Sequence, residues 1–218
     1  MVNIYVIPTW FFSYDIILNL IFGLITFAVG YAAWKIYELI DDPTSRTFSI
    51  GFMFITFSYW LHALFSGILF TKLKFQGVIP LSSYDFFSSG ANFFHIILFL
   101  LGAITLVYMT LQKRSKRLYA LLCALTFIPV VFAQYNLYLF HVYAAILLGY
   151  VFYHYIQQYR EQNHKPKTLV LIAFGILFLN NVNFILATNS GTYYIVSDIV
   201  NLVAYILILI SLIRVRRK

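Results

Sequence analysis

The chain has 218 residues, of which 62% are hydrophobic and only 10% charged, and its formal net charge is +8. A soluble domain carries roughly a quarter charged residues, so this composition excludes a soluble globular protein. The mean hydropathy of +0.84 instead predicts an integral membrane protein.

Seven apolar runs follow one another along the chain, each close to the roughly 20 residues that a helix needs to cross a bilayer. Because the runs are continuously apolar and do not alternate, helices are preferred over barrel strands. The predicted helices cover Tyr14–Tyr37, Phe48–Phe70, Phe87–Met109, Leu118–Gln134, Leu137–Gln157, Thr168–Thr188 and Thr192–Ile213. The sequence therefore predicts an all-α, seven-transmembrane helix bundle that forms one domain over residues 1–218.

The connections between these runs are short. The longest, Thr71–Phe86, is a candidate lid on the outside. The fourth run is the shortest and contains Pro129, which removes a backbone donor and predicts a tilt or kink there. The single cysteine, Cys123, excludes an intramolecular disulfide and argues against a Cys-based metal site.

Lys and Arg residues are distributed unequally between the two sides of this predicted bundle. Thirteen lie on one side, whereas only Lys72 and Lys74 lie on the other. Because basic residues concentrate in cytoplasmic loops, the N-terminus is predicted outside and the C-terminus in the cytoplasm, as in a multi-pass cell-membrane protein. Contacts between basic helix ends and anionic lipid headgroups account for the net charge. No nucleic acid partner is expected, although the basic tail could dock a membrane or cytoplasmic protein.

Polar residues within the runs gather in the outer half of the predicted membrane. Counted at about 1.5 Å per residue from each outer helix end, they lie roughly 6 to 14 Å deep. They are Asn19, His62, His95, His141, Asn180, Asn183, Asp198 and Asn201. Since such groups are costly in hydrocarbon, their common layer predicts one polar cavity that opens to the outside.

Helical spacing places several of these residues on common faces, in the pairs Ser58 and His62, Asn92 and His95, Asn180 and Asn183, and Asp198 and Asn201. The predicted ligand-binding residues are Asp198, Asn201, Asn92, Asn180, Asn183 and Ser58. Asp198 is the strongest candidate, because an unpaired carboxylate in hydrocarbon must hold a proton or a cation. A lone intramembrane Asn is more often a contact between helices than a ligand contact. The small residues of the first helix, Gly23, Thr26 and Gly30, are typical of close helix packing.

The first functional hypothesis is a site for a small neutral or cationic ligand, in a sensor or a solute carrier. Helices one to three and five to seven align as two parallel triplets, in which Asn92 pairs with Asp198 and His95 with Asn201. Parallel repeats with a site at their interface are typical of transporters. This 3+1+3 layout, together with the length and the outside N-terminus, is similar to that of the SWEET sugar carriers. That family has prolines in helices one, two, five and six, and this chain has none inside those four, so membership is not inferred.

Two other hypotheses stay open. His62, His95 and His141, with Asp198, could hold a metal ion, and His62 and His95 could be axial ligands of one b-type haem, in a redox protein or hydrolase. No HExxH motif accompanies them, so an enzyme is not favoured. In the third hypothesis the protein is a structural or assembly subunit, and every polar group joins helices.

Overall fold

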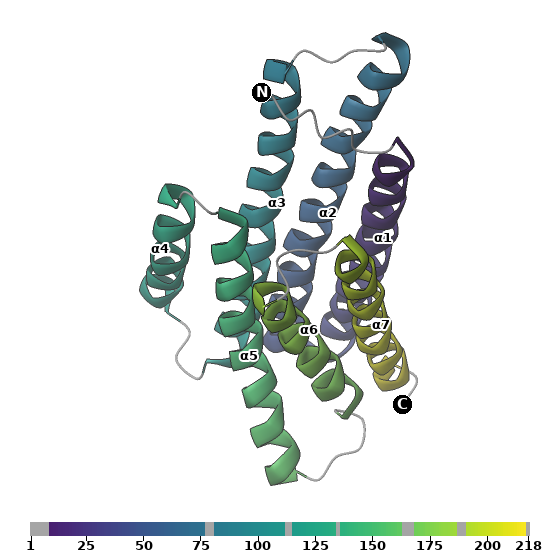
Figure 1. The fold of residues 1–218 in the computed structure, drawn as a ribbon. Helices are drawn as coiled ribbons and strands as arrows, with labels where there is room; N and C mark the ends of the chain where they lie inside the picture. The colour runs from purple at the N-terminus through teal and green to yellow at the C-terminus, as the bar shows by residue number, and fades with distance from the viewer. Residues whose placement is uncertain are drawn as a thin grey trace.

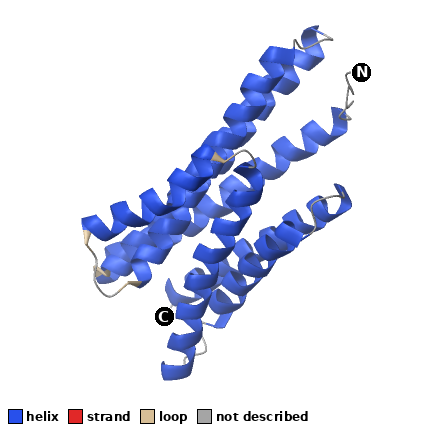
Figure 2. Cartoon of the chain, turned by 60° about the vertical axis from the view of Figure 1, so that its left-hand side comes forward, coloured by secondary structure: helices blue, strands red, loops and turns tan. Residues whose placement is uncertain are grey.

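A computed structural model describes residues 9–76, 81–111, 115–133, 136–162, 168–186 and 191–216 of the chain. These residues form seven helices, and none of them lies in a strand (Figures 1 and 2). The helices are α1 Thr9–Ile40, α2 Pro43–Gln76, α3 Leu81–Thr110, α4 Lys116–Phe132, α5 Asn136–Gln162, α6 Thr168–Leu186 and α7 Gly191–Arg216. The predicted all-α helix bundle is confirmed.

Successive helices run in opposite directions, so the start of α1 and the end of α7 lie at opposite ends of the bundle (Figure 1). We call the end where α1 begins the outer end. The opposite end, which carries Lys35, Arg46, Arg160 and Arg214 near helix termini, is the basic end. The antiparallel order places these four basic residues at one end of the bundle, whereas Lys72 and Lys74 lie near the outer end of α2.

Six of the helices are long and apolar enough to cross a bilayer, which makes this a multi-pass membrane protein. The remaining helix, α4, has 17 residues and is about 25 Å long at the usual helical rise. It lies at the margin of the bundle beside α5 and returns the chain between the parallel helices α3 and α5 (Figure 1). One face of α4, formed by Leu121, Leu125, Ile128 and Phe132, is exposed, as expected for contact with lipid.

Most helices extend beyond the predicted apolar runs. α2 continues to Gln76 and α3 already begins at Leu81, so the predicted connection Thr71–Phe86 is helical in its described part, and its role as a lid stays a prediction. An apolar run marks only the part of a helix inside hydrocarbon, whereas the backbone hydrogen bonds continue until a residue stops them. Residues 77–80, which include Gly77 and Pro80, lie outside the described residues. The last predicted residues of helices four and six also lie outside them.

The turn between α1 and α2 is specified by Asp41, Asp42 and Pro43. Asp41 closes α1 with a φ of 49°, in the left-handed region that Asp tolerates better than most residues. The carboxylate of Asp42 accepts hydrogen bonds from the backbone N–H groups of Thr44 and Ser45, both at 3.0 Å, and so caps α2. Pro43 then occupies the first helical position, where no donor is needed.

Small residues bring α1, α2 and α3 close together. A Cβ atom added at Gly23 would lie 2.1 Å from the indole of Trp60, and one at Gly102 would lie 2.7 Å from the carbonyl oxygen of Gly51. The Ser49 hydroxyl donates to the Gly30 carbonyl of α1 at 2.7 Å. The small-residue face predicted for the first helix is therefore a packing surface, as expected.

Helices that follow one another in the chain pack together within α1–α3 and within α5–α7. α1 packs on α2, α2 on α3, α5 on α6 and α6 on α7, and the two groups meet where α3 packs on α5 and α1 on α7. The contact between α1 and α7 lies next to the polar groups described below.

Candidate outer polar site

Four ionisable side chains from four helices approach one another in the outer half of the bundle. They are Asp15 of α1, His62 of α2, His95 of α3 and Asp198 of α7, and with Asn201 of α7 we call them the outer cluster. The Asp15 Oδ2 atom lies 3.7 Å from His62 Nδ1, and the rings of His62 and His95 meet edge to face with centroids 5.4 Å apart. The charges of Asp15 and Asp198 interact electrostatically across the contact between α1 and α7.

Asp15 is held in place by its neighbours. The Asn19 side chain, one turn further along α1, donates to Asp15 Oδ1 at 2.9 Å and to the Asp15 carbonyl at 2.9 Å. The Ser66 hydroxyl of α2 donates to Asp15 Oδ2 at 3.2 Å. This carboxylate was not predicted as a site residue, because Asp15 is the second residue of the predicted helix Tyr14–Tyr37. Since α1 begins at Thr9, Asp15 lies about 9 Å inside the helix. The Asp15–Asn19 spacing of four residues was the available signal.

Asp198 is buried, with only 8% of its surface exposed. Its Oδ2 atom is one of four buried side-chain atoms of the described residues that have no hydrogen-bond partner. The others are His62 Nδ1, His95 Nδ1 and Asn201 Oδ1. Native proteins leave few buried polar atoms unsatisfied, because each costs free energy comparable to a lost hydrogen bond. All four atoms belong to the outer cluster, which is the arrangement expected of a site that receives a ligand or water.

Aromatic rings lie beneath the outer cluster. The Tyr59 and Tyr205 hydroxyls are 3.1 Å apart, and Tyr205 lies one turn below Asn201 on α7. Phe22 stacks on Tyr59 with centroids 4.9 Å apart, and His95 lies 5.3 Å from the Tyr59 ring. Tyr59, Tyr205 and Phe22 are buried, so this aromatic layer separates the outer cluster from the basic end.

Several predicted site residues do not join the outer cluster. Asn92 and Asn183 are exposed on the surface of the bundle, and their predicted role in ligand binding stays a prediction. The sequence alignment that paired Asn92 with Asp198 therefore pairs an exposed residue with a buried one. Ser58 is buried, and its hydroxyl donates to the Ile55 carbonyl at 2.7 Å.

The polar groups of α5 and α6 form separate contacts between helices. His141 Nδ1 lies 3.1 Å from Asn181 Oδ1, and the His141 ring stacks on Phe184 with centroids 4.4 Å apart. Asn180 exchanges hydrogen bonds with Ser197 of α7. These groups hydrogen-bond to one another and join α5 to α6 and α6 to α7. Asn181 was missed in the sequence because its neighbours Asn180 and Asn183 fitted one predicted face.

The donor set predicted for a metal is not assembled. Among the described residues, no three His, Cys, Asp or Glu side chains are grouped so that they could hold a metal ion. His141 is hydrogen-bonded to Asn181. The rings of His62 and His95 are in direct contact, which leaves no space between them for the macrocycle of a haem. These residues as arranged therefore fit neither group.

Comparison of the chain with protein-family models, with curated proteins and with solved structures gave no match.

Proposed function

We propose that this multi-pass membrane protein binds a small, positively charged organic ligand in the outer cluster, as a sensor or a solute carrier. The observation that supports the proposal best is the carboxylate of Asp198, which is buried and has an unsatisfied oxygen. A second carboxylate, Asp15, interacts with it electrostatically, and no ion pair joins either one to a described Lys or Arg. Asp15 has only His62 beside it, and Asp198 has no ion-pair partner among the described residues, so the two carboxylates create a negative potential that attracts a cation.

The chemistry of the lining favours an organic cation over a metal ion. Asp198 Oδ2 and Asn201 Oδ1 are acceptors that can receive N–H groups from a ligand. The aromatic layer below offers Tyr59, Tyr205 and Phe22, and aromatic faces attract ammonium groups. A dedicated metal site would instead need three or more grouped ligands, which the described residues do not provide.

Access is from the outer end. Asp15 and Asp198 each lie within about 11 Å of the start of their helices, at the usual helical rise. The path toward the basic end is filled by the aromatic layer and by the fully buried side chains of Phe52 and Ile208. This arrangement suits a receptor site, or the outward-facing state of a carrier. A carrier would have to separate the Tyr59–Tyr205 contact in order to open inward.

Thermal unfolding of the detergent-purified protein tests the proposal. The probes are the chlorides of ammonium, methylammonium, tetramethylammonium and guanidinium, each compared with sodium chloride at the same ionic strength. At least one organic cation should raise the unfolding midpoint of the wild type, and Asp198→Asn should remove that increase. Asp41→Asn is the matched control, because it removes the same charge from an exposed residue at the basic end and should leave the increase unchanged. If the wild type shows no cation-specific shift, or if Asp198→Asn keeps it, the proposal is wrong.

A further inference from the structure

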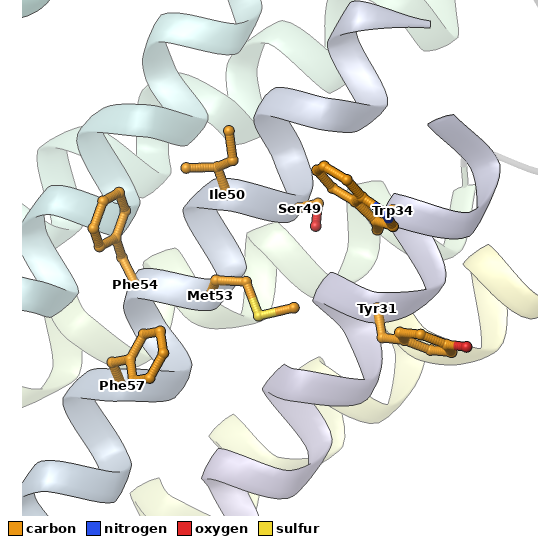
Figure 3. A pocket seen from close by; sticks show the side chains of 7 residues that line it. All are labelled: Tyr31, Trp34, Ser49, Ile50, Met53, Phe54 and Phe57. Carbon is orange, nitrogen blue, oxygen red and sulfur yellow. The ribbon is translucent and has the colours of Figure 1, made fainter. Parts of the chain in front are cut away.

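A groove on the lipid-facing side of α1 and α2 has no part in the outer cluster. It has a volume of about 490 Å³ and is lined by Tyr31 and Trp34 of α1 and by α2 residues from Ser49 to Phe57 (Figure 3). Figure 3 shows Met53 extending from α2 toward α1, with Phe54 and Phe57 further along α2. The groove lies within two membrane-spanning segments, Ser13–Ile40 and Pro43–Lys72.

The groove presents an almost entirely apolar surface. Its serine, Ser49, is buried and donates its hydroxyl to the Gly30 carbonyl at 2.7 Å, so this group is already satisfied. Tyr31, Trp34, Ile50 and Phe57 are between 37% and 52% exposed, which means that the groove opens away from the bundle core. From Ser49 to Phe57 the helix rises about 12 Å. That length is close to half of the roughly 30 Å hydrocarbon core, which corresponds to one leaflet.

A cationic group lies where the groove meets the basic end. Arg46 precedes Ser49 by three residues and Ile50 by four, so it shares their face of α2, one turn closer to the basic end. Its guanidinium carbon lies 5.8 Å from the centroid of the Tyr37 ring. Among the described residues no carboxylate forms an ion pair with Arg46, whereas nearby Lys35 is bonded to Glu38 at 2.6 Å. Arg46 is therefore available to a phosphate group, which its planar guanidinium binds well.

We propose that this groove binds an anionic phospholipid of the leaflet at the basic end, with an acyl chain against Met53 and Trp34 and the phosphate at Arg46. The occupant is inferred from the apolar groove at leaflet depth together with the guanidinium of Arg46, since the Glu38 carboxylate at the same end is bonded to Lys35 and to the Trp34 indole. A zwitterionic lipid would fill the same apolar groove but would be attracted less by Arg46. One basic residue should favour binding of the anionic lipid over the zwitterionic lipid by about fivefold.

Trp34 provides an internal reporter, because brominated acyl chains quench the fluorescence of a tryptophan that they touch. The purified protein is reconstituted into phosphatidylcholine vesicles that contain equal fractions of brominated phosphatidylglycerol or brominated phosphatidylcholine. The brominated phosphatidylglycerol should quench more strongly, and Trp34→Phe should remove the difference. If the difference persists in Trp34→Phe, it arises at Trp10 or Trp60 and the proposed site is wrong.

Two arginine variants identify the headgroup contact. Arg46→Gln should make the two lipids quench equally, whereas Arg160→Gln, an exposed arginine at the basic end of α5, should keep the preference. Loss of the preference in both variants would show a general surface charge effect and overturn the proposal. Equal quenching in the wild type would show ordinary lipid contact only. Absence of quenching by either lipid would show that another protein copy covers the groove. Both of these results contradict the proposal.

Discussion

The carboxylate of Asp15 in α1 is 3.7 Å from the Nδ1 atom of His62 in α2. Asp15 also interacts electrostatically with the buried carboxylate of Asp198 in α7. Asp15 accepts hydrogen bonds from Asn19 and Ser66, whereas the Oδ2 atom of Asp198 accepts none from the described residues. The two carboxylates therefore have different roles. Asp15 is fixed by its hydrogen bonds, whereas Asp198 Oδ2 is unsatisfied and is the atom to which we assign the ligand in the proposed function.

This difference predicts that substitution of Asp15 lowers the stability of the bundle more than substitution of Asp198 does. Asp15→Ala should lower the free energy of unfolding by about 1–3 kcal/mol, because Asn19 and Ser66 lose a buried acceptor. Asp198→Asn should leave the folded bundle nearly as stable as the wild type, because no described hydrogen bond to Oδ2 is lost. Thermal unfolding of both variants in one detergent, without added organic cations, measures the comparison. A more severe loss in Asp198→Asn would mean that Asp198 has a structural role.

The hydroxyl contact between Tyr59 and Tyr205 predicts coupled stabilities. Tyr205→Phe should cost about 0.5–1.5 kcal/mol, because it removes a buried hydrogen bond. Adding Tyr59→Phe should then cost less than Tyr59→Phe does in the wild type, since the shared bond is already absent. Unfolding of the two single variants and the double variant completes the cycle. Strictly additive changes would show that the hydroxyls do not interact.

Close approach of α2 and α3 predicts that Gly102 tolerates no side chain. A Cβ atom there would lie 2.6 Å from Ile55 Cγ1 and 2.7 Å from the Gly51 carbonyl oxygen, and the backbone atom cannot yield without moving α2. Gly102→Ala should therefore destabilise the bundle by about 1–3 kcal/mol. Gly67→Ala is the matched control, because an added Cβ meets nothing within 4 Å. It should be neutral or stabilising by up to about 1 kcal/mol. Equal unfolding midpoints of the two variants would contradict the packing.

The cap of α2 predicts a dependence on pH. Burial raises the pKa of the Asp42 carboxyl, but hydrogen bonds from Ser45 and Thr44 outweigh this effect and hold that pKa below its ordinary value of 3.8. A lowered pKa means that folding favours the carboxylate, so its contribution is complete above the ordinary value and is lost as pH falls through the lowered one.

Variants of Asp42 test this contribution. Asp42→Ala should cost about 1 kcal/mol near neutral pH, whereas Asp42→Asn, which caps equally well, should cost little. Unfolding midpoints measured from neutral to acidic pH should show the wild type converging toward Asp42→Ala only below about pH 4. An advantage of the wild type over Asp42→Ala that stays constant into strong acid would contradict the role of the ionised carboxylate.

The sequence predicted the helices well because apolar run length is set by bilayer thickness. It predicted which residue types are costly, and of these the rings of His62 and His95 are in contact. It placed Ser58, Asn180 and Asp198 on buried faces correctly, but not every polar residue. In a membrane, the lipid-facing and buried faces are both apolar, so periodicity does not distinguish them as it does in water. Asn92 and Asn183 were assigned inward for that reason, and both are exposed.

The second carboxylate, Asp15, was missed for a different reason. Hydropathy locates the hydrocarbon part of a helix but not its true start, so Asp15 looked like an end residue. In the structure α1 starts at Thr9 and contacts α7, which brings Asp15 close to Asp198. A contact between the first and last helices is a property of tertiary packing and has no local sequence signal.

The decisive measurement is equilibrium dialysis of the purified protein against the radiolabelled organic cation that raises its unfolding midpoint most, with Asp198→Asn and Asp41→Asn measured in parallel. We expect saturable binding to the wild type and to Asp41→Asn, and none to a folded Asp198→Asn. Binding that is absent from the wild type, or that survives in Asp198→Asn, would contradict the claim that the outer cluster is a cation site.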